Sequence, residues 1–201
     1  MGATICCFTN LMGNQEADAL VRGLRHRDPD LLGQLIEQYQ YRLFRYLLYL
    51  TRSRDKAEDL FQETWVRVLE RGHQYDGKSK FESWLFTIAR NLTIDYWRRN
   101  KSVADLEELS DATGSDVPVP FALQHAMSAS DLVWRGEESE RIQTALGTLP
   151  AMQREVLVLR FHEEFTLEEI AKLVAAPVST VKSRLYRGLD HLRNLLEGAQ
   201  A

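Results

Sequence analysis

Apolar residues recur at helical spacing along most of this 201-residue chain, and clean alternation of apolar and polar residues is absent. The segment DLLGQLIEQYQYRLFRYLLYLT, which starts at Asp30, predicts one long helix. SRDKAEDLFQETWVRVLERG predicts a second helix, with Ser53 as its N-cap and Gly72 at its end. After the turn-forming segment HQYDGKSK, a third helix opens near Ser79 and carries FESWLFTIARNLTIDYWRRN, residues 81–100. The pattern therefore predicts an all-α fold.

Residues 102–136 interrupt this periodicity. They are dense in acidic residues, Ser, Gly, Pro and Thr, a composition typical of a flexible linker. Helical periodicity then returns and continues to the end of the chain. We therefore predict a disordered leader over residues 1–14 and two small helical domains, 15–101 and 137–201, joined by a flexible acidic linker.

Charge is distributed unevenly along the chain. The formal net charge is −4, but residues 78–101 hold six basic and two acidic side chains. Residues 172–193 hold five basic side chains and one acidic one, whereas residues 102–140 hold nine acidic side chains and one arginine. Screening limits electrostatic attraction to about 8–10 Å, so the local charge matters more than the total. The two basic segments are compatible with a nucleic-acid partner.

Several functional classes find no support in the sequence. No run of eighteen apolar residues occurs and no secretory signal is recognisable, so we expect a cytoplasmic protein without membrane insertion. The only cysteines, Cys6 and Cys7, are adjacent and lie in the predicted leader. The segment His162-Glu163-Glu164 does not match H-E-x-x-H, and no Gly-rich phosphate loop or Ser/His/Asp set stands out. We therefore predict no enzyme activity, no cofactor, no metal and no small-molecule substrate.

The segment TLEEIAKLVAAPVSTVKSRLYRGLDHL, residues 166–192, predicts a helix-turn-helix. Thr166 and Glu169 have the spacing of a capping box at the start of a short helix. Pro177 prevents that helix from continuing into the next one. Ala175 lies in the turn, where a glycine is often found.

The second helix of this motif has a buried stripe and a basic flank. We expect Ser179 or Thr180 to cap it and the helix to run from Val181. Its apolar stripe is Val181, Leu185, Leu189 and Leu192, and its exposed flank is Lys182, Ser183, Tyr186 and Arg187. Lysine and arginine near the start of such a helix can bind guanine edges in the major groove of DNA. Any helical hairpin shares some of these features, so a purely structural hairpin is the alternative.

The helix over residues 81–100 combines aromatic and basic side chains. One face is the expected core stripe, which consists of Phe81, Leu85, Ile88, Ala89, Leu92 and Tyr96. The opposite face holds Phe86, Arg90 and Trp97, with Thr87, Asn91 and Arg98 beside them and Trp84 on the border. Such a face suits single-stranded nucleic acid, because bases stack on aromatic rings while arginines hold the backbone. Packing of this face on another helix explains it equally well.

Three segments in order resemble a bacterial RNA polymerase sigma factor of the extracytoplasmic-function (ECF) branch. They are AEDLFQETWVRVLER, FESWLFTIARNLTIDYWRR, and LPAMQREVLVLRFHEEFTLEEIA followed by STVKSRLYRGLDHLR. The resemblance covers about residues 16–101 and 137–195, and the combination is far more specific than a helix-turn-helix alone. It implies a transcription initiation factor whose partners are core RNA polymerase, promoter DNA and an anti-sigma factor. Such a regulator can bury both basic segments by docking the two domains together.

The resemblance also implies roles for individual residues. For core-polymerase binding these are Asp59, Gln62 and Glu63 of a D-x-x-Q-E pattern, with Trp65 and Leu69. For the melted minus-ten strand they are Trp84, Phe86, Arg90, Asn91, Asp95, Trp97 and Arg98, with Asn91 reading a flipped base. For the minus-thirty-five duplex they are Ser179, Thr180, Lys182, Ser183, Tyr186 and Arg187. The N-terminal domain would thus bind polymerase and melt the minus-ten element, and the C-terminal domain would read the minus-thirty-five element.

A stand-alone helix-turn-helix transcription regulator is the second hypothesis. The N-terminal domain would then serve as a dimerisation or sensor module. Such a regulator binds promoter duplex without polymerase, whereas a sigma factor needs the core enzyme. This hypothesis leaves FESWLFTIARN and the D-x-x-Q-E pattern without an explanation.

Overall fold

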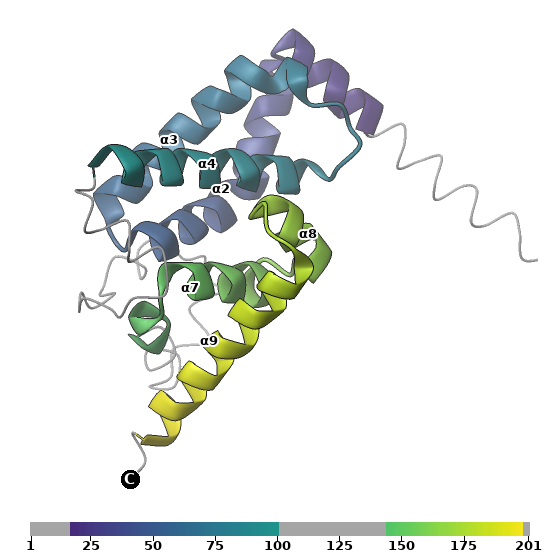
Figure 1. The fold of residues 1–201 in the computed structure, drawn as a ribbon. Helices are drawn as coiled ribbons and strands as arrows, with labels where there is room; N and C mark the ends of the chain where they lie inside the picture. The colour runs from purple at the N-terminus through teal and green to yellow at the C-terminus, as the bar shows by residue number, and fades with distance from the viewer. Residues whose placement is uncertain (1–16, 101–143, 199–201) are drawn as a thin grey trace, which may run out of the picture.

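The computed structural model describes residues 17–100 and 144–198, and every regular element within these two ranges is helical (Figure 1). The predicted leader, with Cys6 and Cys7, and the predicted linker lie outside the described residues.

The first range folds into a bundle of long helices. A helix over residues 17–26 precedes α2 (Pro29–Thr51), α3 (Arg54–Arg71), the 3-10 turn η1 (Gly72–Gln74) and α4 (Phe81–Asn100). α2 begins where the carboxylate of Asp28 accepts the backbone N–H of Asp30 at 3.0 Å. α3 begins directly after Ser53 and ends at Gly72, which confirms both predicted boundaries, although the Ser53 side chain makes no capping hydrogen bond.

The second range contains the predicted helix-turn-helix. A short helix over residues 144–148 precedes α7 (Ala151–Leu157), the π-helical turn η5 (Val158–His162), α8 (Leu167–Leu173) and α9 (Val178–Gly198). The capping box that opens α8 is confirmed. The Thr166 hydroxyl accepts the backbone N–H of Glu169 at 3.2 Å, and the Glu169 carboxylate accepts the backbone N–H of Thr166 at 2.9 Å.

The turn between α8 and α9 closes α8 with a Schellman motif. Ala175 adopts a left-handed conformation, with φ of 51°, at the position where glycine is most common. Its backbone N–H donates to the carbonyl of Lys172, and the N–H of Ala176 donates to the carbonyl of Ala171. These bonds satisfy carbonyl groups that the end of the helix leaves without an intrahelical partner.

The start of α9 differs from the prediction. The helix begins at Val178, three residues before the predicted position, because the carbonyl of Pro177 accepts the N–H groups of Thr180 and Val181. Ser179 and Thr180 therefore lie within the first turn of α9 rather than capping it.

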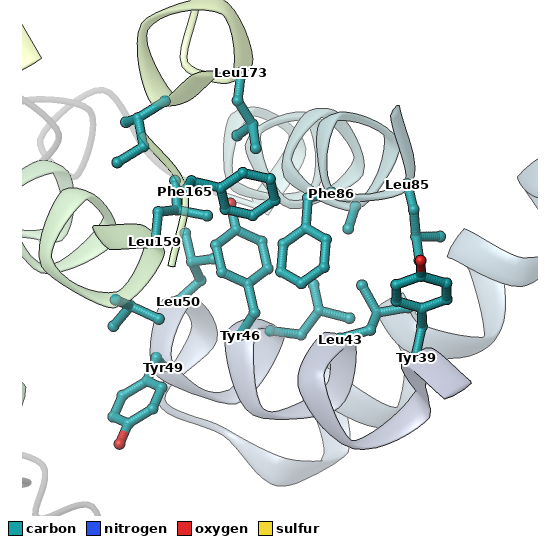
Figure 2. Packing of buried hydrophobic residues seen from close by; sticks show 14 of the residues in the cluster. Tyr39, Leu43, Tyr46, Tyr49, Leu50, Leu85, Phe86, Leu159, Phe165 and Leu173 are labelled. Carbon is teal, nitrogen blue, oxygen red and sulfur yellow. The ribbon is translucent and has the colours of Figure 1, made fainter. Parts of the chain in front are cut away.

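The two helical units share one hydrophobic core. α2 contacts α7 and η5, and α4 contacts α8. Figure 1 shows the C-terminal helices, in green and yellow, packed against the underside of the N-terminal bundle. At this junction the rings of Tyr46, Phe86 and Phe165 meet, with centroid distances of 5.0 Å and 5.5 Å from Phe86 (Figure 2). Tethered domains were predicted, and the described parts of them are docked.

Candidate nucleic-acid and polymerase interfaces

The predicted duplex-binding face of α9 is exposed. Ser179, Lys182, Ser183, Tyr186 and Arg187 are all accessible, and Thr180 is half-buried. The five exposed residues follow helical spacing along one side of the first three turns. Tyr186 is 64% exposed although its ring is large and apolar, so packing within the described residues does not account for it.

The opposite side of α9 packs on α7 and α8. Val181 and Leu185 are buried, as predicted, but Leu189 is 36% exposed. Gly188 occupies the next inward position instead. A β-carbon there would lie 2.8 Å from Cδ1 of Leu157, so glycine allows α9 and α7 to approach closely. The predicted stripe is therefore wrong at Leu189, because the inward positions advance by three residues at that turn rather than by four.

The second face of α4 is largely buried. Phe86 and Arg90 were predicted on a solvent-facing, strand-binding surface, but they are 0% and 7% exposed. Phe86 packs between Tyr46 of α2 and Phe165, which precedes α8. The Nε of Arg90 donates to Oε1 of Glu155 at 2.8 Å. Of the two interpretations left open for this face, packing on another helix holds at Phe86 and Arg90.

The remaining predicted residues of α4 are accessible to different degrees. Asn91, Asp95 and Arg98 are exposed and follow one another at helical spacing, with 3.9 Å between Arg98 Nη1 and Asp95 Oδ1. Trp84 and Trp97 are half-buried. Trp84 belongs to an aromatic cluster, with its ring centroid 5.4 Å from Tyr75. The exposed strip thus offers an amide, a carboxylate and a guanidinium group.

Two buried carboxylates connect the helical units. Glu155 and Glu163, which lie in α7 and directly after η5, are 3% and 2% exposed. Glu155 accepts hydrogen bonds from Arg90 and from the hydroxyl of Tyr46, the latter at 3.0 Å. Burial, followed by the charge of Glu155, raises the pKa of Tyr46 well above 10, so its hydroxyl stays protonated and donates.

Glu163 is held by two arginines of α2. Arg42 Nε donates to its Oε2 at 2.8 Å, and Arg45 Nη2 donates to its Oε1 at 2.9 Å. Burial alone would lower the pKa of Arg42, but its bonds to Glu163 and Glu82 outweigh this and the pKa is raised. Neither Glu155 nor Glu163 was predicted as a functional residue. The available signal was an acidic residue at the start of the mostly apolar segment EVLVLRF and a second one two positions after its end.

The α3 helix presents a mixed polar and apolar strip. Asp59 and Gln62 are exposed, and Leu69 is 41% exposed. Glu63 is half-buried and paired with Arg67, 3.0 Å from Oε1 to Nε. Trp65 was predicted to contact polymerase, but it is buried, with its ring 6.3 Å from that of Phe61. Trp65 therefore lies on the buried side of α3 and packs in the core.

Val66 is the residue of this strip that the prediction missed. Its side chain is 44% exposed and lies one turn after Gln62 and three residues before Leu69. An exposed valine four residues after the glutamine of the D-x-x-Q-E pattern was the signal for it.

The described residues offer neither a metal site nor a membrane span. Within 17–100 and 144–198, no group of three or more His, Cys, Asp or Glu residues could hold a metal ion. In the same ranges, no helix has the length and apolar character needed to cross a membrane.

Known proteins match the chain over both helical units. Sigma-70 region 2 matches residues 35–103, and Sigma-70 region 4 matches residues 139–192. The ECF RNA polymerase sigma factor SigX of Bacillus subtilis is 30% identical over 81% of this chain and 82% of its own length. SigW of the same organism is also 30% identical, over 88% of this chain and 94% of its own length. The sigma factor RpoE of Bartonella quintana, solved in complex with the anti-sigma factor NepR, has a TM-score of 0.65 and 25% identity over 82% of this chain and 96% of its own.

These matches, together with the paired helical units and the exposed helix-turn-helix, identify a sigma-type transcription factor. The chain belongs to the extracytoplasmic-function family of RNA polymerase sigma factors. It is therefore a transcription initiation factor that directs RNA polymerase to promoters, and the predicted family and fold class are confirmed.

Proposed function

We propose that this sigma factor brings core RNA polymerase to promoters whose minus-thirty-five element is read as duplex by α9 and whose minus-ten element is read as a melted strand by α4. The exposed polar and basic side of α9 is the observation that carries this proposal. Lys182 and Arg187 supply the charge for phosphate or guanine contacts, and Ser179 and Ser183 supply hydroxyl groups close to the start of the helix.

The minus-ten assignment is supported by the exposed strip on α4. Asn91 carries both a donor and an acceptor, which suits the Watson–Crick edge of a flipped base. Arg98 lies two turns further along the same strip, where a strand backbone passing Asn91 would continue. Trp97, half-buried beside them, offers part of a ring for stacking. Phe86 and Arg90 join this surface only if the C-terminal domain moves away.

Core-polymerase binding is assigned to the exposed strip of α3. Val66 and Leu69 give it an apolar centre, and Asp59 and Gln62 give it a polar border. Protein interfaces commonly combine an apolar centre with a polar rim. Within the described residues, no packing partner covers this strip enough to bury Val66 or Leu69.

An anti-sigma factor is proposed as a second protein partner. The likeness to the Bartonella RpoE, which was solved in complex with NepR, supports this proposal. Pull-down from cells of the source organism with the full chain, followed by competition with core polymerase for the recovered protein, tests it. A partner that binds together with polymerase, without displacing it, would contradict the proposal.

Reconstituted transcription tests the main proposal. The purified protein is mixed with sigma-free core polymerase and genomic DNA fragments, and transcript 5′ ends are sequenced. We expect defined starts that share two upstream motifs. An Asn91→Ala variant should relax base preference at one minus-ten position, while Asn194→Ala, an exposed asparagine on α9, should not. Absence of transcripts, together with tight duplex binding by the protein alone, would instead support a stand-alone regulator.

A further inference from the structure

Three arginines of the N-terminal domain point toward the C-terminal domain. Arg42 and Arg45 lie one turn apart on α2, and Arg90 lies on α4. The aromatic rings of Tyr46 and Phe86 are at the same junction, with centroids 5.0 Å apart, and the guanidinium carbon of Arg42 lies 5.9 Å from the centre of the Phe86 ring. This combination of guanidinium groups and rings is what proteins use to hold single-stranded nucleic acid.

Carboxylates of the C-terminal domain form ion pairs with all three arginines. Glu155 binds Arg90, and Glu163 binds both Arg42 and Arg45. Among the described residues, the side-chain partners of both glutamates belong to the N-terminal domain. The two carboxylates are therefore not needed to hold the C-terminal domain together, and their burial depends on docking. A buried carboxylate without partners is costly, so separation must return both to water.

Carboxylate and phosphate groups engage arginine in the same way. Both are anions that accept short, charge-assisted hydrogen bonds from guanidinium groups, frequently two at a time. Glu163 receives bonds to both of its oxygens, Oε1 and Oε2, as a bridging phosphate would. Arg90 directly precedes Asn91 and lies about 100° further around α4, so its guanidinium group flanks the exposed strip of Asn91, Asp95 and Arg98 rather than continuing it.

We propose that the C-terminal domain is an intramolecular competitor of the promoter strand, with Glu155 and Glu163 occupying a phosphate-binding site formed by Arg90, Arg42 and Arg45. In the docked form the site is filled and Phe86 is covered. Separation of the domains exposes the ring, frees Arg45 and Arg90 from the two carboxylates, and leaves Arg42 with Glu82 alone, 3.1 Å away within its own domain. Strand binding and docking are then mutually exclusive. This inference rests on the proposed role of α4 in strand binding and adds two residues of α2 to that surface.

The first experiment measures strand affinity and domain separation on the same full-length chain. Fluorescent dyes are attached at His73→Cys and Asn194→Cys, two exposed positions on different domains, with Cys6 and Cys7 replaced by serine. The probe is a short single-stranded DNA of mixed sequence at low salt. We expect the paired variant Glu155→Gln/Glu163→Gln to increase the dye separation and to bind the strand about tenfold more tightly, because buried charge pairs couple strongly.

Matched variants separate competition from general charge effects. Glu168→Gln removes one carboxylate, against two in the paired variant, from an exposed position of α8 and should change neither readout. If the paired glutamine variant stays docked, Glu155→Arg places two guanidinium groups against each other and forces separation, and the same gain in affinity is then required. Arg42→Gln and Arg45→Gln, each added to the separated form, should reduce strand affinity several-fold. A role limited to docking would leave that affinity unchanged.

The result that overturns the inference is a separated form that binds the strand no better than the wild type. Strand binding by the wild type without any increase in dye separation would overturn it as well. Both outcomes are distinct from failure of the proposed function, which shows as an absence of defined transcripts with core polymerase. Transcription by the wild type with no strand binding by any variant would reject the competition alone.

Discussion

Replacing Phe86 by alanine should destabilise the protein strongly, because this side chain fills the centre of the core that the two domains share. Its ring is 0% exposed and lies 5.0 Å from Tyr46 and 5.5 Å from Phe165, measured between centroids. The guanidinium carbon of Arg42 lies 5.9 Å from the same ring. Alanine removes contacts with α2 and with the C-terminal domain at once.

The expected loss follows from burial and from how far the surroundings can collapse. Truncation of a fully buried phenylalanine to alanine costs about 3–5 kcal/mol in free energy of unfolding, part of which reflects the cavity left behind. Phe165 belongs to the C-terminal domain. If the variant undocks, its contact with Phe86 is lost in the folded state too, and the measured loss in free energy of unfolding is smaller. We therefore expect about 3 kcal/mol, at the lower end of that range.

Urea unfolding, followed by circular dichroism and by tryptophan fluorescence, measures this loss. The two signals should coincide in the wild type if the docked domains unfold together, and they should separate in Phe86→Ala. Trp97→Ala is the control, because it removes a larger aromatic ring from a half-buried position on the same helix. A loss below about 1 kcal/mol for Phe86→Ala would refute this reasoning and indicate that the domains are mostly apart in solution.

Three further predictions concern the helix-turn-helix. Ala175→Gly should raise the free energy of unfolding by about 0.5 kcal/mol, because it relieves the left-handed strain at φ of 51°. Its control, Ala171→Gly within α8, should lower the free energy of unfolding by about 1 kcal/mol, and the shift in Tm measures both effects. The pKa of Glu169 lies below its ordinary 4.5, first because of the backbone hydrogen bond with Thr166. Its stabilising contribution should therefore be complete above that value and disappear as pH falls through the lowered pKa, and Glu169→Gln should remove this pH dependence in urea unfolding. Arg187→Ala should weaken duplex binding by the complex with core polymerase and, if it contacts phosphate, reduce the slope of log affinity against log salt by about 1.

Local patterns predicted the helices and the capping box of α8 because the determinants of these features are close in sequence. The Thr166–Glu169 capping box involves two residues three apart, and Pro177 excludes a continuous helix whatever the tertiary context. The start of α9 was misplaced for a related reason. Hydroxyl residues favour helix caps, but here the residue before the helix is Pro177, whose carbonyl accepts the N–H groups of Thr180 and Val181 and whose side chain has no acceptor.

The docked arrangement could not be predicted, because periodicity shows which positions avoid water without showing what covers them. The second face of α4 contains Phe86 and Arg90, residue types that suit either a nucleic-acid strand or a protein surface with acidic groups. Only the positions of Glu155 and Glu163 distinguish the two possibilities, and these residues follow in sequence by more than fifty positions. Their pairing is a long-range contact for which no local pattern exists.

The second face of α4 suits both a nucleic-acid strand and a protein domain, and its proposed use gives a physical reason for this. A surface that binds a strand in one state and a protein domain in another needs rings that stack on bases or on other rings, and arginines that donate hydrogen bonds to either phosphate or carboxylate. Phe86 satisfies the first requirement by packing on Phe165, and Arg90 satisfies the second by binding Glu155. A face built for docking alone gains more stability from aliphatic residues than from a buried ion pair, since desolvation offsets most of the attraction within the pair. The presence of three arginines at this junction therefore favours a surface that also operates in the separated state.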